Sequence, residues 1–342
     1  MIINTRASML LDMMRSLSKI SKKNTGFGKN LLVDSTKDRV HIHASSSMVY
    51  GQAWLDAQVV EPGVFLLPIS VIPFLQPLGD SSISLEITLD EIIINSDSNS
   101  IVLPQIGGDV GDVSMPTSTP KWSGFNIRRL KNIRYATGLS QHNLDVYWMV
   151  EDKIITTDRY RTAVYRPDSF NVKIEAGLYD FSTSLIDSQE MDVCIEERIW
   201  LGNDRYNISM PRLSLKIPTA LLRLAEVPIP TSVTLNRDEF LNNVSLSLYL
   251  MDNEHIASLI SLRGNTLMIK ADTAKGGNES VQLIKRDDQT AIDLKVNTKY
   301  LWDVVNNCEN KQINLCMITL GETPLLVIQD DDINHYLLPL RS

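Results

Sequence analysis

Near the middle of the chain stands the stretch Thr156-Thr157-Asp158-Arg159-Tyr160-Arg161-Thr162-Ala163-Val164-Tyr165. It follows an alternating run, Val146 to Ile155, so the sequence predicts a strand, a tight polar corner and a second strand. Thr-Asp is a natural start for an Asx-type corner, because the Asp side chain can bond to backbone two residues further on. The Arg-Tyr-Arg that follows places stacking and hydrogen-bond donor groups on this corner.

The chain ends in Tyr336-Leu337-Leu338-Pro339-Leu340-Arg341-Ser342, which carries apolar residues almost to the last position. A chain end of this composition is typical of a tail that is docked on the fold. Corner and tail together resemble the bacterial sliding clamp, the beta subunit of DNA polymerase III. That family has a Thr-Asp-Gly-His-Arg-Leu-Ala corner in its second domain and an apolar-Pro-apolar-Arg tail. The lower similarity elsewhere suggests a divergent copy, and one hypothesis is that a phage encodes it.

Composition places the chain among ordinary globular proteins. Its 342 residues are too many for one typical core, and 43% are hydrophobic and 22% charged. No apolar run approaches the ~20 residues that cross a bilayer, and the N-terminus lacks the pattern of a signal peptide. Three widely spaced cysteines (Cys194, Cys308 and Cys316) form no C-x-x-C motif, which favours free buried thiols in a cytoplasmic protein.

Charge is segregated along the chain although the net charge is −8. The first 29 residues contain six basic residues and one acid, and residues 121–134 contain five basic residues and no acid. Concentrated basic stretches in an acidic chain are compatible with binding of nucleic acid at defined places.

The order of predicted elements repeats three times, at a period of roughly 110–120 residues, which indicates duplicated domains. The predicted domains are residues 1–116, 117–226 and 227–342, with a Gly/Pro/Ser/Thr-rich linker at 107–120. Predicted helices, most with one apolar face, span 6–23, 68–78, 126–138, 181–189, 238–250 and 296–307. The predicted strands between them alternate, so each domain is expected to be α+β, with an antiparallel sheet packed on two helices.

The resemblance implies a ring: sliding clamps are head-to-tail dimers of three-domain chains, with helices lining the hole. It implies a non-enzymatic processivity factor that encircles double-stranded DNA and binds DNA polymerase and a clamp loader, without a cofactor or a membrane. Basic side chains of the inner helices would then contact phosphates without reading sequence. The predicted DNA contacts are Arg15, Lys19, Lys22, Lys23, Arg128, Arg129, Lys131 and Arg134. A solvated helix face is the alternative for each of them.

In this family, partner peptides bind a pocket between the second and third domains. Matching positions give the predicted pocket residues Trp148, Thr157, Tyr160, Arg161, Thr162, Pro218, Leu338, Pro339 and Leu340. Apolar residues with a few polar groups suit an extended peptide. Arg159, Tyr160 and Thr162 replace the glycine, histidine and leucine of the family corner, which predicts a shallower and more polar pocket. The alternative is a purely structural corner beside a docked tail.

The family also joins a sheet edge of the first domain to the third domain of the other subunit. By resemblance this predicts a homodimer interface with Ile101 and Leu103 against Tyr249 and Leu250. Exposed edge strands do require a partner or protection.

Two other classes of function stay open on the sequence: a metal-dependent DNA-processing enzyme, and a structural β-rich virion or assembly protein. The metal ligands of such an enzyme would be Asp158 and the run Asp330-Asp331-Asp332. A solvated turn is the favoured interpretation of that run. His41 and His43 share a strand face without an evident third ligand, so exposed or packed histidines are favoured over a metal site.

Overall fold

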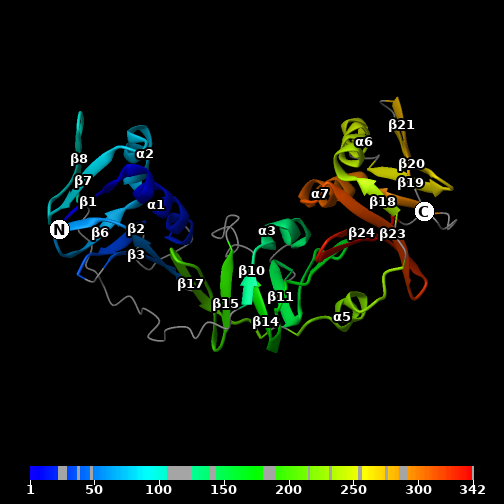
Figure 1. Ribbon diagram of the computed structural model, residues 1–342, viewed down its shortest axis with the longest axis horizontal. Coiled ribbons are helices and arrows are strands. Elements are labelled where there is room, and N and C mark those ends of the chain that lie inside the picture. The colour runs from blue at the N-terminus through cyan, green and yellow to red at the C-terminus, as the bar shows by residue number, and fades with distance from the viewer. Residues whose placement is uncertain are drawn as a thin grey trace. The chain divides into compact units, whose positions relative to one another are not determined.

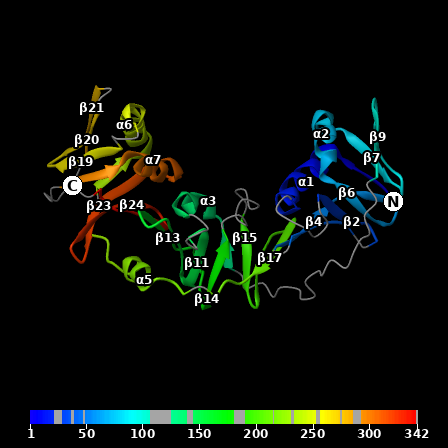
Figure 2. The ribbon, with the colours of Figure 1, turned by 180° about the vertical axis from the view of Figure 1, so that it is seen from behind.

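A computed structural model describes residues 1–340 except 22–28, 37–38, 47–48, 106–124, 139–143, 180–189, 215, 231–232, 253–255, 274–275 and 285–291. The chain divides into two compact units (Figures 1 and 2). The first contains residues 1–126 and 189–212, and the second contains residues 127–188 and 213–342. All strand pairings described in the two units are antiparallel.

The first unit contains two sheets. The smaller has the strand order β5 (Gln58–Glu61), β1 (Ile2–Arg6), β7 (Ser82–Ile87), β8 (Glu91–Ser96), β9 (Ser100–Pro104). The larger has the order β10 (Phe125–Ile127), β15 (Met191–Ile195), β16 (Arg198–Gly202), β17 (Tyr206–Pro211), β4 (Tyr50–Leu55), β3 (Val40–Ser45), β2 (Asn30–Asp34), β6 (Val64–Pro68). Pairing of β17 with β4 therefore joins strands of the predicted first and second domains in one sheet.

Helix α1 (Ala7–Ser21) covers β2, β3 and β4 of the larger sheet (Figure 1). The predicted apolar face of this helix is confirmed, because Leu10, Met13, Met14 and Leu17 are all buried. A short helical segment packs against α1 and is interrupted by Pro73 and Pro77, which cannot donate helical hydrogen bonds. It consists of η1 (Ile69–Val71), α2 (Ile72–Leu75) and η2 (Gln76–Leu78).

The second unit also contains two sheets. The larger has the order β14 (Val172–Tyr179), β11 (Val146–Glu151), β12 (Lys153–Thr157), β13 (Arg161–Tyr165), β25 (Ile333–Leu337), β24 (Thr323–Asp330), β23 (Gln312–Leu320), β18 (Val233–Asn236). The smaller has the order β21 (Gly276–Leu283), β20 (Thr266–Thr273), β19 (Ala257–Arg263), β22 (Ile292–Asn297). Pairing of β13 with β25 joins the strand after the Thr-Asp corner to the strand before the tail.

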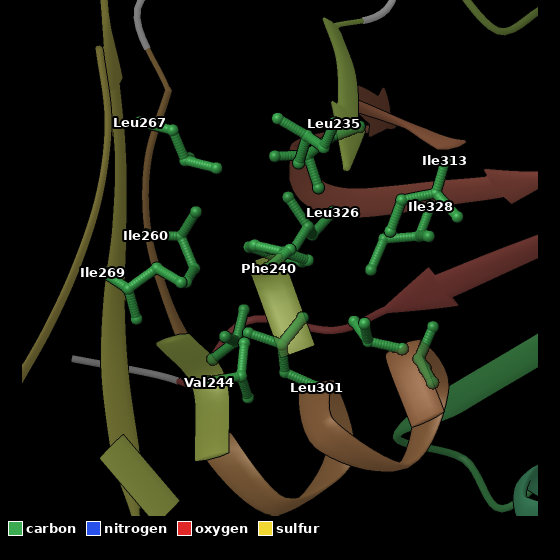
Figure 3. Close-up of a cluster of buried hydrophobic side chains, with 14 of the residues drawn as sticks. Leu235, Phe240, Val244, Ile260, Leu267, Ile269, Leu301, Ile313, Leu326 and Ile328 are labelled. Atoms are coloured by element: carbon green, nitrogen blue, oxygen red, sulfur yellow. The ribbon is translucent and has the colours of Figure 1, made fainter. Parts of the chain in front are cut away.

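Two helices, α6 (Arg237–Leu250) and α7 (Thr298–Asn307), lie side by side next to these sheets (Figures 1 and 2). Each follows a strand and begins at an asparagine: the side chains of Asn236 and Asn297 accept hydrogen bonds from the backbone N–H three residues on. Figure 3 shows Phe240 and Val244 of α6 meeting Leu301 of α7 and the apolar side chains of both sheets in one core.

The sequence predicted several of these elements incorrectly. Residues 126–138 are not one basic helix: they form the end of β10, then α3 (Leu130–Ile133) and η3 (Arg134–Ala136). The sequence did not predict β1 or α5 (Thr219–Ala225), and the predicted helix over 296–307 begins only after β22. The predicted linker at 107–120 and helix at 181–189 lie outside the described residues.

All three cysteines are buried and free, as predicted. Over the described part of the chain, no helix is both long and apolar enough to cross a membrane. The exact boundaries 1–116, 117–226 and 227–342 remain a prediction.

Candidate functional site

The Thr-Asp corner joins β12 to β13 and is held by its own side chains. Asp158 accepts hydrogen bonds from the backbone N–H groups of Tyr160 and Arg161, at 2.9 and 2.8 Å. The Thr157 hydroxyl donates to the Arg161 carbonyl at 2.7 Å and accepts from the backbone N–H of Arg159 at 3.1 Å. Between these bonds Arg159 adopts a φ of 81°, a region that favours glycine. The predicted Asx-type corner is therefore present.

The corner lies directly beside the tail. In the β13–β25 ladder Arg161 pairs with Leu337 and Thr162 pairs with Tyr336. The backbone N–H of Leu338 then continues the ladder by donating to the Tyr160 carbonyl at 3.0 Å. Two segments that are about 175 residues apart in sequence thus form one continuous surface, as docking of the tail requires.

A pocket of about 410 Å³ opens beside this junction. Its lining comes from the corner, from the tail, from α5 and from the β23–β24 hairpin. The lining residues are Leu144, Thr157, Arg159, Tyr160, Thr162, Pro218, Ala220, Leu221, Leu224, Leu320, Leu325, Tyr336 and Leu338. Six of these are leucines, so the cavity offers apolar side chains a place out of water, and two threonines and two tyrosines add hydroxyl groups.

A buried core supports the apolar side of the pocket. Leu144, Leu224, Leu325 and Tyr336 belong both to the pocket lining and to a core cluster beneath it. Helix α5 reaches this core through Leu224 and Ala225, and it begins directly after Pro218, whose carbonyl accepts the first helical hydrogen bonds. The pocket is thus built on packed elements, which fixes its shape before any ligand arrives.

Arg161 fastens the corner to α7. Its guanidinium donates to Asp158 at 2.8 Å and to Asp303 of α7 at 2.6 Å, and it stacks 4.2 Å from the centre of the Tyr300 ring. Burial alone would lower the pKa of Arg161, but the two carboxylates outweigh burial and raise it. Arg161 therefore stays charged and positions the corner.

Comparison with solved structures matches this architecture over the whole chain. The DNA polymerase III beta subunit of Thermotoga maritima aligns with a TM-score of 0.80 and 16% identity, covering 100% of this chain and 99% of that one. The Pseudomonas aeruginosa beta subunit aligns at 0.76 and 14%, with both chains fully covered. A Helicobacter pylori beta clamp bound to a DNA ligase peptide aligns at 0.79 and 18%, again with full coverage.

This chain has the sliding-clamp fold. The expected α+β architecture of antiparallel sheets and helices is confirmed, and a full-length match of 342 residues fits a three-domain clamp. No protein-family model matches the sequence, and no curated protein sequence matches it.

Five of the predicted pocket residues line the pocket of this clamp-like chain: Thr157, Tyr160, Thr162, Pro218 and Leu338. The other four do not. Trp148 is 3% exposed in the core below, and Arg161 is turned toward α7. Pro339 and Leu340 lie past the lining, where the Leu340 N–H donates to the Lys295 carbonyl at 2.8 Å.

Most of the apolar lining was not predicted from the sequence. Leu221 and Leu224 were missed because α5 itself was not predicted. Leu320 and Leu325 flank the turn of the β23–β24 hairpin, and nothing in their local sequence distinguishes them from other strand leucines. The apolar spacing of Leu221 and Leu224 on one helix face was the one available signal.

The predicted DNA contacts divide into different environments. Arg15 and Lys19 lie on α1, exposed and half-buried respectively. Arg128 is exposed between β10 and α3, Lys131 on α3 and Arg134 on η3. Lys131 also pairs with Glu309, with 3.3 Å between nitrogen and oxygen. Lys22 and Lys23 lie outside the described residues.

Arg129 is a correction to that set. It is 5% exposed, and its guanidinium pairs with Asp330 and Asp332, with Glu309 at 3.6 Å. Burial alone would lower its pKa, but these carboxylates raise it. A buried guanidinium that is already neutralised cannot reach a phosphate, so Arg129 is a structural residue.

The acidic run is likewise not the solvated turn that the sequence favoured. Asp330 is fully buried and accepts hydrogen bonds from the backbone N–H groups of Glu309 and Asn310, besides its pair with Arg129. Asp331 does occupy the exposed turn, with a φ of 59°. Asp158 is also engaged, because Arg161 and two backbone N–H groups bind its carboxylate.

Cys308, Asp330 and His335 form a buried group whose ligand atoms lie within 4.8 Å of one another. Their surroundings disfavour a cation. The Arg129 guanidinium already neutralises Asp330, and burial raises the pKa of the Cys308 thiol, so the thiol stays protonated. His335 Nδ1 lies 2.6 Å from the Tyr135 hydroxyl, and burial lowers the pKa of His335 to about 4. This group is best explained as core.

His41 and His43 are packed, which is one of the two arrangements, exposed or packed, that the sequence favoured over a metal site. Their rings stack with 5.9 Å between centroids, and His43 Nδ1 lies 2.6 Å from the Tyr50 hydroxyl. His41 Nδ1 contacts the Gln52 amide.

The predicted dimer residues lie at exposed edges of their own units. Ile101 and Leu103 are half-buried on β9, the last strand of the five-stranded sheet. Tyr249, 83% exposed, and Leu250 end α6 in the second unit. Their role in a dimer remains a prediction.

Proposed function

We propose that this chain is a DNA sliding clamp, a non-enzymatic processivity factor that forms a homodimeric ring around duplex DNA. The pocket at the junction of corner and tail carries the proposal. It is apolar, preformed and open, and it belongs to a fold in which the Helicobacter pylori clamp holds a DNA ligase peptide. The same pocket would here tether a polymerase and other replication proteins, and engage a clamp loader.

Enclosure of DNA explains how a chain with a net charge of −8 can act on it. Contacts with phosphate are screened by salt and blind to sequence, so a ring can slide while it stays linked. In this proposal Arg15, Lys19, Arg128, Lys131 and Arg134 supply the described contacts, and Lys22 and Lys23 belong to the same set. The dimer would form through Ile101 and Leu103 of one subunit and Tyr249 and Leu250 of the other.

The alternative of a metal-dependent DNA-processing enzyme loses support, because arginines already engage the carboxylates of Asp158 and Asp330. The alternative of a virion or assembly protein has no specific observation in its favour.

A topological experiment tests the proposal. The chain is loaded on a nicked circular plasmid with a clamp loader and ATP, and the complex is isolated by gel filtration. A sliding clamp stays on the circle in moderate salt and is lost after a restriction enzyme linearises the plasmid. Retention that does not change on linearisation would indicate ordinary surface binding and would contradict the ring.

A further inference from the structure

Among the described residues that line the pocket, one side chain is charged, Arg159. The other twelve described lining residues are leucines, threonines, tyrosines, a proline and an alanine, so none of them is acidic. A lone positive charge at the margin of an apolar cavity selects the charge of whatever enters it.

No intramolecular partner satisfies this charge among the described residues. Arg159 is exposed, and no ion pair involving it occurs there, whereas Arg161 of the same corner is paired with Asp158 and Asp303. The nearest carboxylate in sequence, Asp158, is taken up by Arg161 and by two backbone N–H groups. The guanidinium is therefore available to a ligand.

The backbone conformation of Arg159 is a second observation that points to a role for its side chain. With φ at 81°, the position favours glycine, and a long side chain there costs backbone strain. The hydrogen bond from its N–H to Thr157 and the Asx bonds on either side hold this conformation. An arginine at this point projects from a rigid corner beside the apolar floor.

We propose that the pocket selects partner segments in which large apolar residues are flanked by an acidic side chain, which pairs with Arg159. This inference rests on the proposed function and specifies the chemistry of its ligand. A guanidinium can bind a carboxylate through two parallel hydrogen bonds, which gives geometric as well as electrostatic preference. The apolar side chains of the segment occupy the leucine-lined floor, and the acid remains at the rim.

Matched synthetic peptides test this preference by fluorescence anisotropy. The probes are fluorescein-labelled, C-terminally amidated Asp-Leu-Leu-Phe-Gly and Gly-Leu-Leu-Phe-Asp, their Asn counterparts, and Gly-Leu-Leu-Phe-Asn with a free carboxylate. Titrations use the full chain as wild type and as the Arg159→Glu, Arg159→Lys and Lys270→Glu variants. Lys270 lies exposed on β20, outside the pocket lining, so its reversal matches the change in net charge.

The two Asp peptides carry the acid at opposite ends, and we expect the wild type to prefer one of them. It should bind that peptide roughly two- to tenfold more tightly than the peptide in which Asn replaces Asp, as for an exposed charge-assisted pair. The preference should persist in Arg159→Lys and Lys270→Glu, disappear or reverse in Arg159→Glu, and weaken with added salt.

The outcomes separate the inference from the proposed function. Equal binding of Asp and Asn peptides by the wild type overturns the inference and leaves a peptide-binding pocket intact. A preference confined to the free-carboxylate peptide also overturns it, in favour of recognition of a chain end. A preference that survives Arg159→Glu assigns the selection to another residue. If no peptide binds the wild type, the pocket assignment itself fails.

Discussion

Arg129 shows how one side chain can be essential to the fold while its sequence context suggests a surface role. It connects α3 to the β24–β25 turn, because it pairs with Asp330 and Asp332 across about 200 residues of sequence. Neither partner can be exchanged alone, since the remaining charge would stay buried.

Replacement of Arg129 by methionine therefore predicts a loss of about 3–5 kcal/mol in unfolding free energy of the second unit. Lys131→Met is the matched control: its side chain is half-exposed and, among the described residues, pairs with Glu309 alone, so a loss within about 1 kcal/mol is expected. Hydrogen exchange of the β24 and β25 amides in urea measures both. Equal losses in the two variants would mean that the Arg129 pairs add nothing beyond a surface contact.

His335 predicts a pH dependence of the same region. Burial holds its folded pKa at about 4, against 6.5 for an unperturbed histidine. The unfolded chain thus takes up a proton at higher pH than the folded chain. The stability contribution is complete above pH 6.5 and falls as the pH drops toward 4, by up to about 3 kcal/mol.

The variant His335→Gln should flatten this dependence, because glutamine does not titrate. Relative to wild type, we expect it to lose about 2 kcal/mol less between pH 7.5 and pH 5.0. The readout is the free energy from hydrogen exchange of α7 and β25 amides. A wild-type His335 signal that titrates near pH 6.5 by NMR would contradict the burial argument.

At the scale of elements, periodicity predicted what is determined locally. Helices α1 and α6 carry their own apolar spacing or capping, and the corner carries its own Asx turn, so sequence alone located all three. The helix predicted over residues 126–138 was wrong at its start. Phe125, Asn126 and Ile127 form a strand because β15 supplies a partner, and this pairing overrides the local helical preference.

In the candidate site too, the sequence predicted the residues whose positions are determined by local sequence. Thr157, Thr162 and Leu338 belong to motifs with a fixed local pattern, and they line the pocket. Leu320 and Leu325 reach it because β25, the strand after β24, pairs with β13 far earlier in the chain, and the burial of Arg129 depends on carboxylates from the far end of the chain. Such contacts leave no trace in a local window of sequence.

Two leucines of the tail allow its two possible roles to be tested separately: lining the pocket and docking the chain end on the fold. Leu338 lines the pocket, whereas Leu340 does not, and both are anchored through backbone N–H groups that alanine retains. Leu338→Ala should weaken binding of the apolar peptides roughly five- to thirtyfold, the effect of losing one partly buried leucine contact. Leu340→Ala should leave it within about twofold. Anisotropy titration measures both, and equal losses would indicate that the tail acts only by docking.

Removal of residues 338–342 extends the same test. Among the described residues it deletes two backbone hydrogen bonds, those of Leu338 and Leu340, each worth about 0.5–1.5 kcal/mol, so the second unit should remain folded while peptide binding is lost. Unchanged peptide affinity after this truncation would exclude the tail from the site.

For the whole molecule, the proposed function requires that a small set of basic side chains contact DNA although the chain as a whole is acidic. If the exposed basic residues of α1, α3 and η3 contact phosphates, neutralising two of them should lower the salt dependence of DNA binding by a predictable amount. Each lost contact is expected to reduce the slope of log affinity against log salt by about 0.9.

We therefore predict a slope reduced by roughly 2 in the double variant Arg15→Gln/Lys19→Gln, and likewise in Lys131→Gln/Arg134→Gln. The control is Arg263→Gln/Lys270→Gln, which removes the same charge from exposed positions of β19 and β20. Affinity for a short duplex, measured by anisotropy between low and moderate salt, gives the slopes. The net charge changes equally in all three double variants. An equal reduction of the slope in all three would therefore mean that DNA affinity depends on the overall charge of the chain. A reduction confined to the first two would assign the contact to those helices, as a ring that slides on phosphates requires.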